Sequence, residues 1–152
     1  MANIEENKKT IKRYFEELMN KQDYSKADEI LHEDYTGAAL GGLKGVDAHK
    51  QVVKQLHSYS SNLTYETLEM IAEGDKIAIF QKVSGTHDGE FNGIQPTGIE
   101  FSMNGSSVYE LKDGKMYRGL SNAVGDWLGM YQQLGVLPPT ADFIQAYNDS
   151  LK

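Results

Sequence analysis

The chain lacks cysteine altogether and has only three prolines and one tryptophan among its 152 residues. Without cysteine there can be no disulfide, no thiolate nucleophile and no zinc site built from cysteine. The absence of disulfides suits a reducing compartment, so we expect a cytoplasmic protein. A chain of this length also fits one core, because two cores would leave each half barely able to offset its chain entropy.

Long apolar runs and an excess of positive charge are missing as well. The first residues contain no apolar signal segment, and the longest aliphatic stretches, such as Ile77 to Phe80, are far too short to span a bilayer. Fifteen Lys and Arg stand against 22 Asp and Glu, a net charge of −7 that repels phosphate backbones and anionic lipid surfaces. We therefore expect neither a nucleic acid nor a membrane as partner.

Common catalytic motifs are absent too. Gly37 and Gly42 have the spacing of a phosphate loop, but Lys44 comes one residue late and Gly45 stands where a magnesium-binding hydroxyl is needed. No GxSxG elbow supports serine-hydrolase chemistry. The histidines show no HExxH or other metal-ligand spacing, and lone helical histidines are mostly solvated. The histidines are His32, His49, His57 and His87. The remaining possibilities are acid–base catalysis and the binding of a ligand without catalysis, and we expect no metal site.

The first 60 residues carry helical signals. Asn3 is a good N-cap, and acidic residues follow it in the first turn. Apolar residues then recur at helical spacing up to Leu18, which predicts a first helix with one buried face. Shorter patterns predict a second helix over Asp23–His32 and a third over Val46–Tyr59. A glycine-rich link separates these two.

After Ser60 the pattern changes to short runs of β-branched and aromatic residues. Glu-Gly-Asp at 73–75 and Lys-Asp-Gly-Lys at 112–115 predict tight hairpin turns. We therefore expect an antiparallel meander of four strands. The predicted strands are Leu63–Ala72, Lys76–Asp88, Ile99–Leu111 and Lys115–Val124.

Three helices followed by a twisted meander predict an α+β fold in which the curved sheet forms a partial cone capped by the helices. The inside of that cone is the expected pocket. A helical pattern returns over Asp126–Leu134, and Pro138-Pro139 then interrupts the chain before an amphipathic end. We divide the chain into a domain over residues 1–137 and a helical tail over residues 138–152.

Two stretches have a more specific content: Gly85-Thr-His-Asp-Gly-Glu-Phe-Asn-Gly-Ile-Gln-Pro-Thr-Gly98 and Asp126-Trp-Leu-Gly-Met-Tyr-Gln-Gln-Leu-Gly135. Together they resemble the SnoaL-like polyketide cyclases, also called ester cyclase-like, within the nuclear-transport-factor-2-like group. The resemblance covers about residues 4–137. It implies a cone-shaped α+β barrel, a homodimer paired through the sheets, and no need for a metal or organic cofactor.

The resemblance also implies a candidate base. In the cyclase members an aspartate before the final helix removes a proton next to a carbonyl, and the enolate closes a ring by intramolecular aldol addition. That aspartate matches Asp126. A structural interpretation stands beside this one, because Asp126 precedes a helix and could cap it. The substitution Asp126→Asn separates the two, since loss of a general base typically costs roughly 10²–10⁴ in rate.

Further candidates surround Asp126. His87 is a possible orienting donor at the pocket mouth and otherwise a hydrogen-bonded residue of a hairpin. Asn122 lies on the last predicted strand beside Ser121, and at most one of these neighbours points inward without a bulge. Large apolar and polar side chains along the elements are candidate ligand contacts, although such residues are more often core. They are Tyr14, Tyr35, Met103, Ser107, Tyr109, Leu120, Trp127 and Met130.

Three hypotheses for function stay open. The first is an enzyme that cyclises or isomerises a small, mostly apolar carbonyl compound by acid–base chemistry without a cofactor. The second is a module of the same shape that binds an apolar ligand without turnover. The third is a protein-interaction scaffold with a filled cone. Gly119, Leu120 and Ser121 stand where many cyclase-like members have a His-Trp type pair, which favours binding over a true cyclase.

Overall fold

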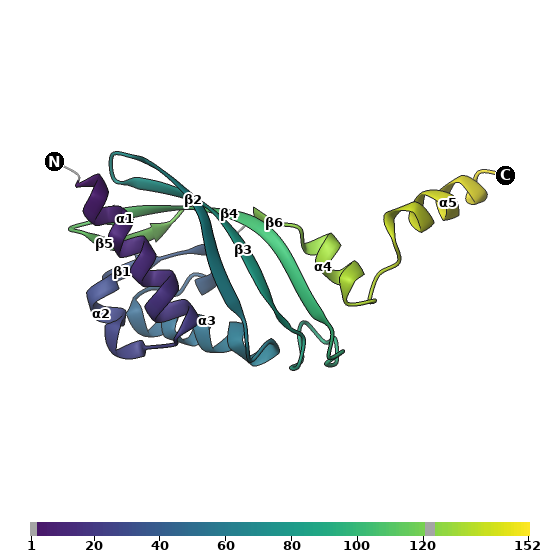
Figure 1. Cartoon of the computed structure of the whole chain (residues 1–152), viewed down its shortest axis with the longest axis horizontal. Helices are drawn as coiled ribbons and strands as arrows, with labels where there is room; N and C mark the ends of the chain where they lie inside the picture. Colours follow the sequence, from purple (N-terminus) through teal and green to yellow (C-terminus); the bar gives the residue numbers. More distant parts are fainter. Residues whose placement is uncertain (1–2, 121–123) are drawn as a thin grey trace.

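The computed structural model describes residues 3–120 and 124–152, and it shows helices packed against one face of a curved sheet (Figure 1). The first helix, α1 (Ile4–Arg13), is capped by Asn3, whose side chain accepts a hydrogen bond from the backbone N–H of Glu6, as predicted. The other helical segments are η1 (Tyr14–Asn20), η2 (Tyr24–Lys26), α2 (Ala27–Ile30), η3 (Ala38–Leu40), α3 (Val46–Tyr59), α4 (Trp127–Gln133) and α5 (Thr140–Ser150).

The first helix changes its winding halfway. α1 runs directly into η1, a π-helical segment. Such segments are rare in proteins, and those that occur are often found at functional sites. The end of η1 is fixed by Asn20, whose side-chain amide donates to the carbonyl of Tyr65 at 2.9 Å and accepts from its N–H at 2.8 Å. His57 of α3 holds the Met19 carbonyl at 2.7 Å. These bonds place the π-helical segment against both the sheet and α3.

The sheet has the order β1-β5-β4-β3-β2, and β6 pairs with β4. Neighbours from β2 to β5 are antiparallel, whereas β1 runs parallel to β5. The sheet is curved and stays open at β1 and β2, so the helices close the cone. The strands are β1 (Leu31–Thr36), β2 (Thr64–Glu73), β3 (Lys76–Thr86), β4 (Glu100–Lys112), β5 (Lys115–Gly119) and β6 (Val124–Gly125). The predicted α+β fold class is confirmed.

Most of the predicted elements agree closely with the structure. The third helix has the predicted bounds, and both hairpin turns lie where they were expected. Asp113 and Gly114 have φ of 52° and 73°, the positive values that a two-residue type I′ turn requires. The last predicted strand is interrupted: β5 ends at Gly119, and β6 pairs further along β4.

One strand was not predicted. The second helix was expected to extend to His32, but it ends at Ile30 and β1 follows at once. The run Leu-His-Glu-Asp-Tyr-Thr contains Glu and Asp, which are poor strand formers, so its sequence pattern is weak. Its strand conformation comes from pairing with β5, which lies more than 80 residues away.

The core lies between the concave face of the sheet and the helices. Side chains from α1, α3 and the middle strands are fully buried there, including Ile11, Val53, Ile77, Ile79 and Met116. A second cluster joins the far ends of β3 and β4 to α4. In the described part of the chain, no helix combines the length and apolar character needed to cross a membrane.

The C-terminal helix projects away from this body (Figure 1). α5 has no buried residue, and Phe143, Ile144 and Tyr147 are all exposed. Gln132 of α4 contacts the segment that leads to α5, since its side chain donates a hydrogen bond to the carbonyl of Pro138 at 2.9 Å.

Candidate functional site

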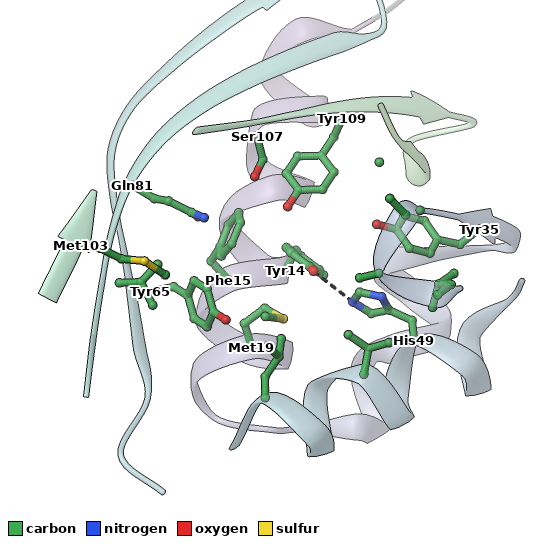
Figure 2. A pocket seen from close by; sticks show the side chains of 18 of the residues that line it. Tyr14, Phe15, Met19, Tyr35, His49, Tyr65, Gln81, Met103, Ser107 and Tyr109 are labelled. Atoms are coloured by element: carbon green, nitrogen blue, oxygen red, sulfur yellow. Dashed lines mark hydrogen bonds between the residues drawn. The ribbon is translucent and has the colours of Figure 1, made fainter. Parts of the chain in front are cut away.

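A cavity of about 400 Å³ lies inside the curve of the sheet, beneath the helices. Figure 2 shows side chains from the helices and from the strands pointing into it. Most of its wall is apolar or aromatic. The lining residues are Tyr14, Phe15, Met19, Tyr35, Gly37, Ala38, Ala39, Leu40, His49, Val52, Leu56, Tyr59, Tyr65, Gln81, Val83, Met103, Ser107, Tyr109, Gly119 and Trp127.

The π-helical segment η1 supplies one side of the wall. Tyr14, Phe15 and Met19 are all buried and all line the cavity. The ring of Phe15 packs edge-on against Tyr14, with centroids 4.8 Å apart, and lies 5.9 Å from the ring of Tyr65. The anchoring of η1 to β2 therefore positions a group of aromatic side chains.

The sheet side carries two polar groups that lack partners. Along β3 the inward positions are Ile77, Ile79, Gln81 and Val83, so Gln81 interrupts an otherwise apolar face. Gln81 Oε1 and Ser107 Oγ are buried and have no hydrogen-bond partner among the described residues. An unsatisfied buried polar group is costly, so each of these atoms marks a place where a ligand or water would be stabilised.

The helical side contains a hydrogen bond between two side chains that are far apart in sequence. The hydroxyl of Tyr14 lies 3.0 Å from Nε2 of His49, which comes from α3 (Figure 2). The ring of Tyr35 packs edge-on against the same imidazole, 4.9 Å away. His49 is only 4% exposed, so the expectation that the helical histidines are solvated was wrong for this residue. Its spacing from Val52 and Val53 places it on the apolar face of the helix.

Burial keeps these groups uncharged. It lowers the pKa of His49 to about 4 and raises the pKa of Tyr59 to about 12. It also raises the pKa of Tyr14 well above its ordinary value, and that of Tyr109 above its own. At neutral pH the cavity therefore presents phenols and a neutral imidazole.

The aromatic group at one end of the cavity joins three elements. Trp127, at the start of α4, lines the cavity and is 36% exposed. Its ring stacks on Phe91, with centroids 6.2 Å apart, and Phe91 also contacts Tyr59 at 4.6 Å. Phe91 belongs to the connection between β3 and β4, so this connection packs against two residues of the cavity wall, Tyr59 and Trp127.

The structure brings most of the predicted ligand contacts together. Six of the eight candidates line the cavity: Tyr14, Tyr35, Met103, Ser107, Tyr109 and Trp127. The other two do not. Leu120 is exposed at the end of β5, and Met130 is buried in the second core cluster. That any of these residues contacts a ligand stays a prediction.

Asp126 caps a helix in the structure. Its Oδ1 accepts a hydrogen bond from the N–H of Gly129 at 2.8 Å, and its side chain is exposed and outside the cavity wall. The structure thus shows Asp126 as the N-cap of α4. Its role as a base stays a prediction.

Of the two other catalytic candidates, only His87 belongs to the described residues. His87 is fully buried in the connection after β3, where Nδ1 accepts from the N–H of Thr97 at 3.3 Å, and it does not line the cavity. Asn122 lies outside the residues that the structure describes.

Two polar residues of the cavity were missed by sequence reasoning. Gln81 could have been found as a polar residue at an inward position of an alternating strand. His49 could have been found from its place on the apolar face of α3. Across residues 3–120 and 124–152, no cluster of three His, Asp or Glu side chains is placed to hold a metal ion.

Comparison with known proteins gives a family. The family model described as SnoaL-like polyketide cyclase matches residues 9–134. No curated protein matches the chain significantly.

Solved structures with similar folds cover most of the chain. TsrD from Streptomyces laurentii is 22% identical with a TM-score of 0.80, over 90% of this chain and all (100%) of TsrD. AclR from Streptomyces galilaeus, proposed to be a hydroxylase, is 22% identical with a TM-score of 0.74, over 98% of this chain and 93% of AclR. A SnoaL-like polyketide cyclase from Agrobacterium tumefaciens is 15% identical with a TM-score of 0.73, over 85% of this chain and 98% of the other. At these identities the likeness shows a shared fold.

Proposed function

The chain belongs to the SnoaL-like polyketide cyclase family, and from this premise we propose that it binds a small, mostly apolar carbonyl-type molecule inside the cone. The observation that carries this proposal is the cavity of about 400 Å³ with an aromatic wall. A volume in this range is typical of small-molecule sites, which combine apolar walls with a few placed polar groups.

The polar atoms in the wall support a ligand that is not purely hydrocarbon. Gln81 Oε1 and Ser107 Oγ are buried without partners in the described part of the chain. Leaving such a group unsatisfied costs about 1–3 kcal/mol, and a ligand that hydrogen-bonds to it recovers part of that cost. Burial of the ligand's apolar surface contributes at roughly 25 cal/mol per Å².

Catalysis is the second candidate: cofactor-independent cyclisation or isomerisation by acid–base chemistry. The family and the Tyr14–His49 hydrogen bond inside the cavity favour it. In this form of the proposal Asp126 is the base, with His87 and Asn122 as further candidates. The exposed position of Asp126 favours binding over catalysis for the state that the structure shows.

We also propose a homodimer paired through the sheet. Ile77 and Ile79 point into the core, so the alternating residues Ala78 and Phe80 point outward, and Phe80 is 45% exposed. Ile71, opposite Ala78 on β2, extends this apolar surface. Light scattering should give twice the chain mass, and Phe80→Lys should convert it to the monomer mass; a wild-type monomer would contradict the pairing. We further propose a cytoplasmic location, because a chain without cysteine forms no disulfide and suits a reducing compartment.

Ligand binding can be tested directly, because Trp127 is the only tryptophan and lines the cavity. Native mass spectrometry of freshly purified protein should show an added organic mass, or titration with 2-acetylnaphthalene should quench the Trp127 fluorescence saturably. Ala38→Phe, which places a large ring in the cavity wall, should weaken that quenching. Protein that carries no ligand and gives no saturable quenching would refute the binding proposal.

A further inference from the structure

One side of the cavity wall depends on the winding of the helical segment η1. In an α-helix with about 3.6 residues per turn, the side chains of Tyr14 and Met19 would point roughly 140° apart. In a π-helix, whose hydrogen bonds join residues five positions apart, they stand on the same side. Both residues line the cavity together with Phe15, and Figure 2 shows the three side chains pointing into it from the helical side. The π-helical winding therefore decides which side chains form this part of the wall.

The local sequence does not favour this winding. The segment reads Tyr-Phe-Glu-Glu-Leu-Met-Asn, and glutamate, leucine and methionine are strong α-helix formers. It contains neither glycine nor proline, the two residues that most often weaken an α-helix. A π-helical turn is much rarer than an α-helical one. Contacts from outside η1 must therefore stabilise the π-helical form.

The first of these contacts is made by Asn20, the last residue of η1. Its side-chain amide donates to the carbonyl of Tyr65 at 2.9 Å and accepts from the N–H of Tyr65 at 2.8 Å. Because β2 is an edge strand, the amide pairs with Tyr65 as the backbone of a further strand would. Rewinding η1 as an α-helix from its first residue would turn Asn20 away from β2 and break both hydrogen bonds.

The second contact is made by His57 of α3. Its Nε2 lies 2.7 Å from the carbonyl oxygen of Met19, and a carbonyl only accepts, so Nε2 carries the hydrogen. Carbonyls in the last turn of a helix lack partners within the helix, and His57 supplies one from outside. The carbonyl of Glu17 is satisfied in the same way, by the N–H of Asp23 at 2.9 Å. The end of η1 is thus held by groups that do not belong to it.

We propose that Asn20 and His57 are positioning residues of the site: each is needed to hold η1 in the π-helical winding, which puts Met19 into the cavity wall. Leu18 is fully buried in the main core cluster instead. In an α-helical winding Leu18 would follow Tyr14 by four positions, share its face and take the place of Met19. As a statement about a binding site this inference rests on the proposed function, but the winding itself can be tested without a ligand.

The test identifies the carbonyl to which each backbone N–H is bonded. Nuclear magnetic resonance detects scalar couplings across hydrogen bonds, and these name both partners. In wild-type protein the N–H of Met19 should couple to the carbonyl of Tyr14, five residues before it. In His57→Leu and in Asn20→Ala this coupling should be lost, and a coupling to the carbonyl of Phe15, four residues before, should replace it.

Two control variants separate winding from general stability. His57→Gln keeps a side-chain N–H that can reach the Met19 carbonyl, so it should keep the wild-type coupling. Asn62→Ala removes another side-chain amide that bonds to backbone, since Asn62 accepts from the N–H of Thr86 at 2.7 Å, but this amide makes no contact with η1 in the described structure. Asn62→Ala should therefore also keep the wild-type coupling, even if it lowers the free energy of unfolding.

A bound probe reports the same change from inside the cavity. With 2-acetylnaphthalene bound, nuclear Overhauser effects from its ring protons should reach the methyl group of Met19 in wild-type protein. In His57→Leu and Asn20→Ala they should reach the methyl groups of Leu18 instead. This exchange of contacts would not follow from a loss of stability alone.

The outcomes distinguish the winding from the binding function. A wild-type coupling from Met19 to Phe15 would refute the inference, and so would a folded His57→Leu or Asn20→Ala protein that keeps the coupling to Tyr14. Lower stability with an unchanged coupling would give both residues a structural role only. If 2-acetylnaphthalene does not bind to wild-type protein, the binding proposal loses its support, whereas the couplings still decide the winding.

Discussion

Burial determines the protonation of the polar side chains around the cavity. His49 contacts Tyr14 and Tyr35, both of which burial keeps as neutral phenols. No charged side chain lines the same cavity in the described structure. The imidazole consequently gains nothing from being protonated in the folded state, and its pKa falls to about 4.

This low pKa predicts a loss of stability on acidification. The unfolded chain takes up a proton at His49 near pH 6.5, whereas the folded chain stays neutral until about pH 4. The contribution of neutral His49 to the free energy of unfolding is therefore fully present above pH 6.5. As the pH falls below 6.5, the free energy of unfolding decreases by at most about 1.4 kcal/mol per pH unit. Urea unfolding from pH 7.5 to 4.5 should show this slope.

His49→Gln is the matched variant, because glutamine can keep the bond to Tyr14 and does not titrate. Its stability should depend less on pH than that of wild type over the same range. The carboxylates with lowered pKa, such as Glu17 and Glu29, lose their stabilising effect below about pH 4.5, outside this window. Equal slopes for the two proteins would contradict the assignment.

Asp126 gives a second prediction at this scale. Asp126→Ala should lower the free energy of unfolding by about 1 kcal/mol, because it removes the cap of α4, whereas Asp126→Asn should keep the cap and nearly all the stability. If Asp126 only caps the helix, Asp126→Asn should also leave the affinity for 2-acetylnaphthalene and any turnover unchanged. A rate loss of 10²–10⁴ without a loss of stability would instead identify it as the base.

At the level of elements, the connection between β3 and β4 depends on one close approach. Gly89 donates its N–H to the Tyr59 carbonyl at 3.0 Å, at the end of α3. A Cβ atom at this position would lie 1.8 Å from the carbonyl oxygen of Ser58. The same connection carries Phe91 to its contacts with Trp127 and Tyr59. Glycine at position 89 therefore lets the connection pack against these two residues of the cavity wall.

Gly89→Ala should lower the free energy of unfolding by about 1–3 kcal/mol, because backbone must move to admit the methyl group. It should also change the fluorescence of Trp127, since Phe91 moves with the connection. Gly125→Ala is the control: its Cβ would lie 3.4 Å from Met103 Sδ, close to an ordinary contact. Thermal unfolding followed by circular dichroism measures both, and equal stabilities would contradict the close approach.

For the whole molecule, the structure separates a packed body from a projecting end. The body holds both core clusters, whereas α5 contributes no buried side chain. The family match also ends at residue 134, before this helix begins. These observations support the proposed division at residue 137.

Truncation after Leu137 should therefore change the free energy of unfolding by less than about 0.5 kcal/mol, since few buried contacts are lost. Affinity for 2-acetylnaphthalene should also stay the same. Chemical unfolding and dialysis on the shortened chain measure the two quantities. A loss above about 1 kcal/mol would show that α5 packs on its own body or on a second copy in solution.

Local patterns were sufficient for most of the elements. The cap at Asn3, the periodicity of α3 and the Asp113-Gly114 turn act over a few residues, so the sequence alone predicted them. Ser107 and Tyr109, two candidate contacts on the predicted strand Ile99–Leu111, both line the cavity. The resemblance carried by residues 85–98 and 126–135 predicted the family, and the helices followed by a meander predicted the cone.

Only the tertiary structure decided which groups meet in the cavity. Tyr14 and His49 are 35 residues apart and touch because η1 and α3 pack side by side, which no local pattern encodes. β1 forms because β5 offers it a partner, and Asp126 turns outward because the first turn of α4 satisfies its carboxylate. The sequence by itself determined most of the elements and the fold class, since those signals are short-range, whereas burial and pairing across the chain decided β1 and the chemistry of the site.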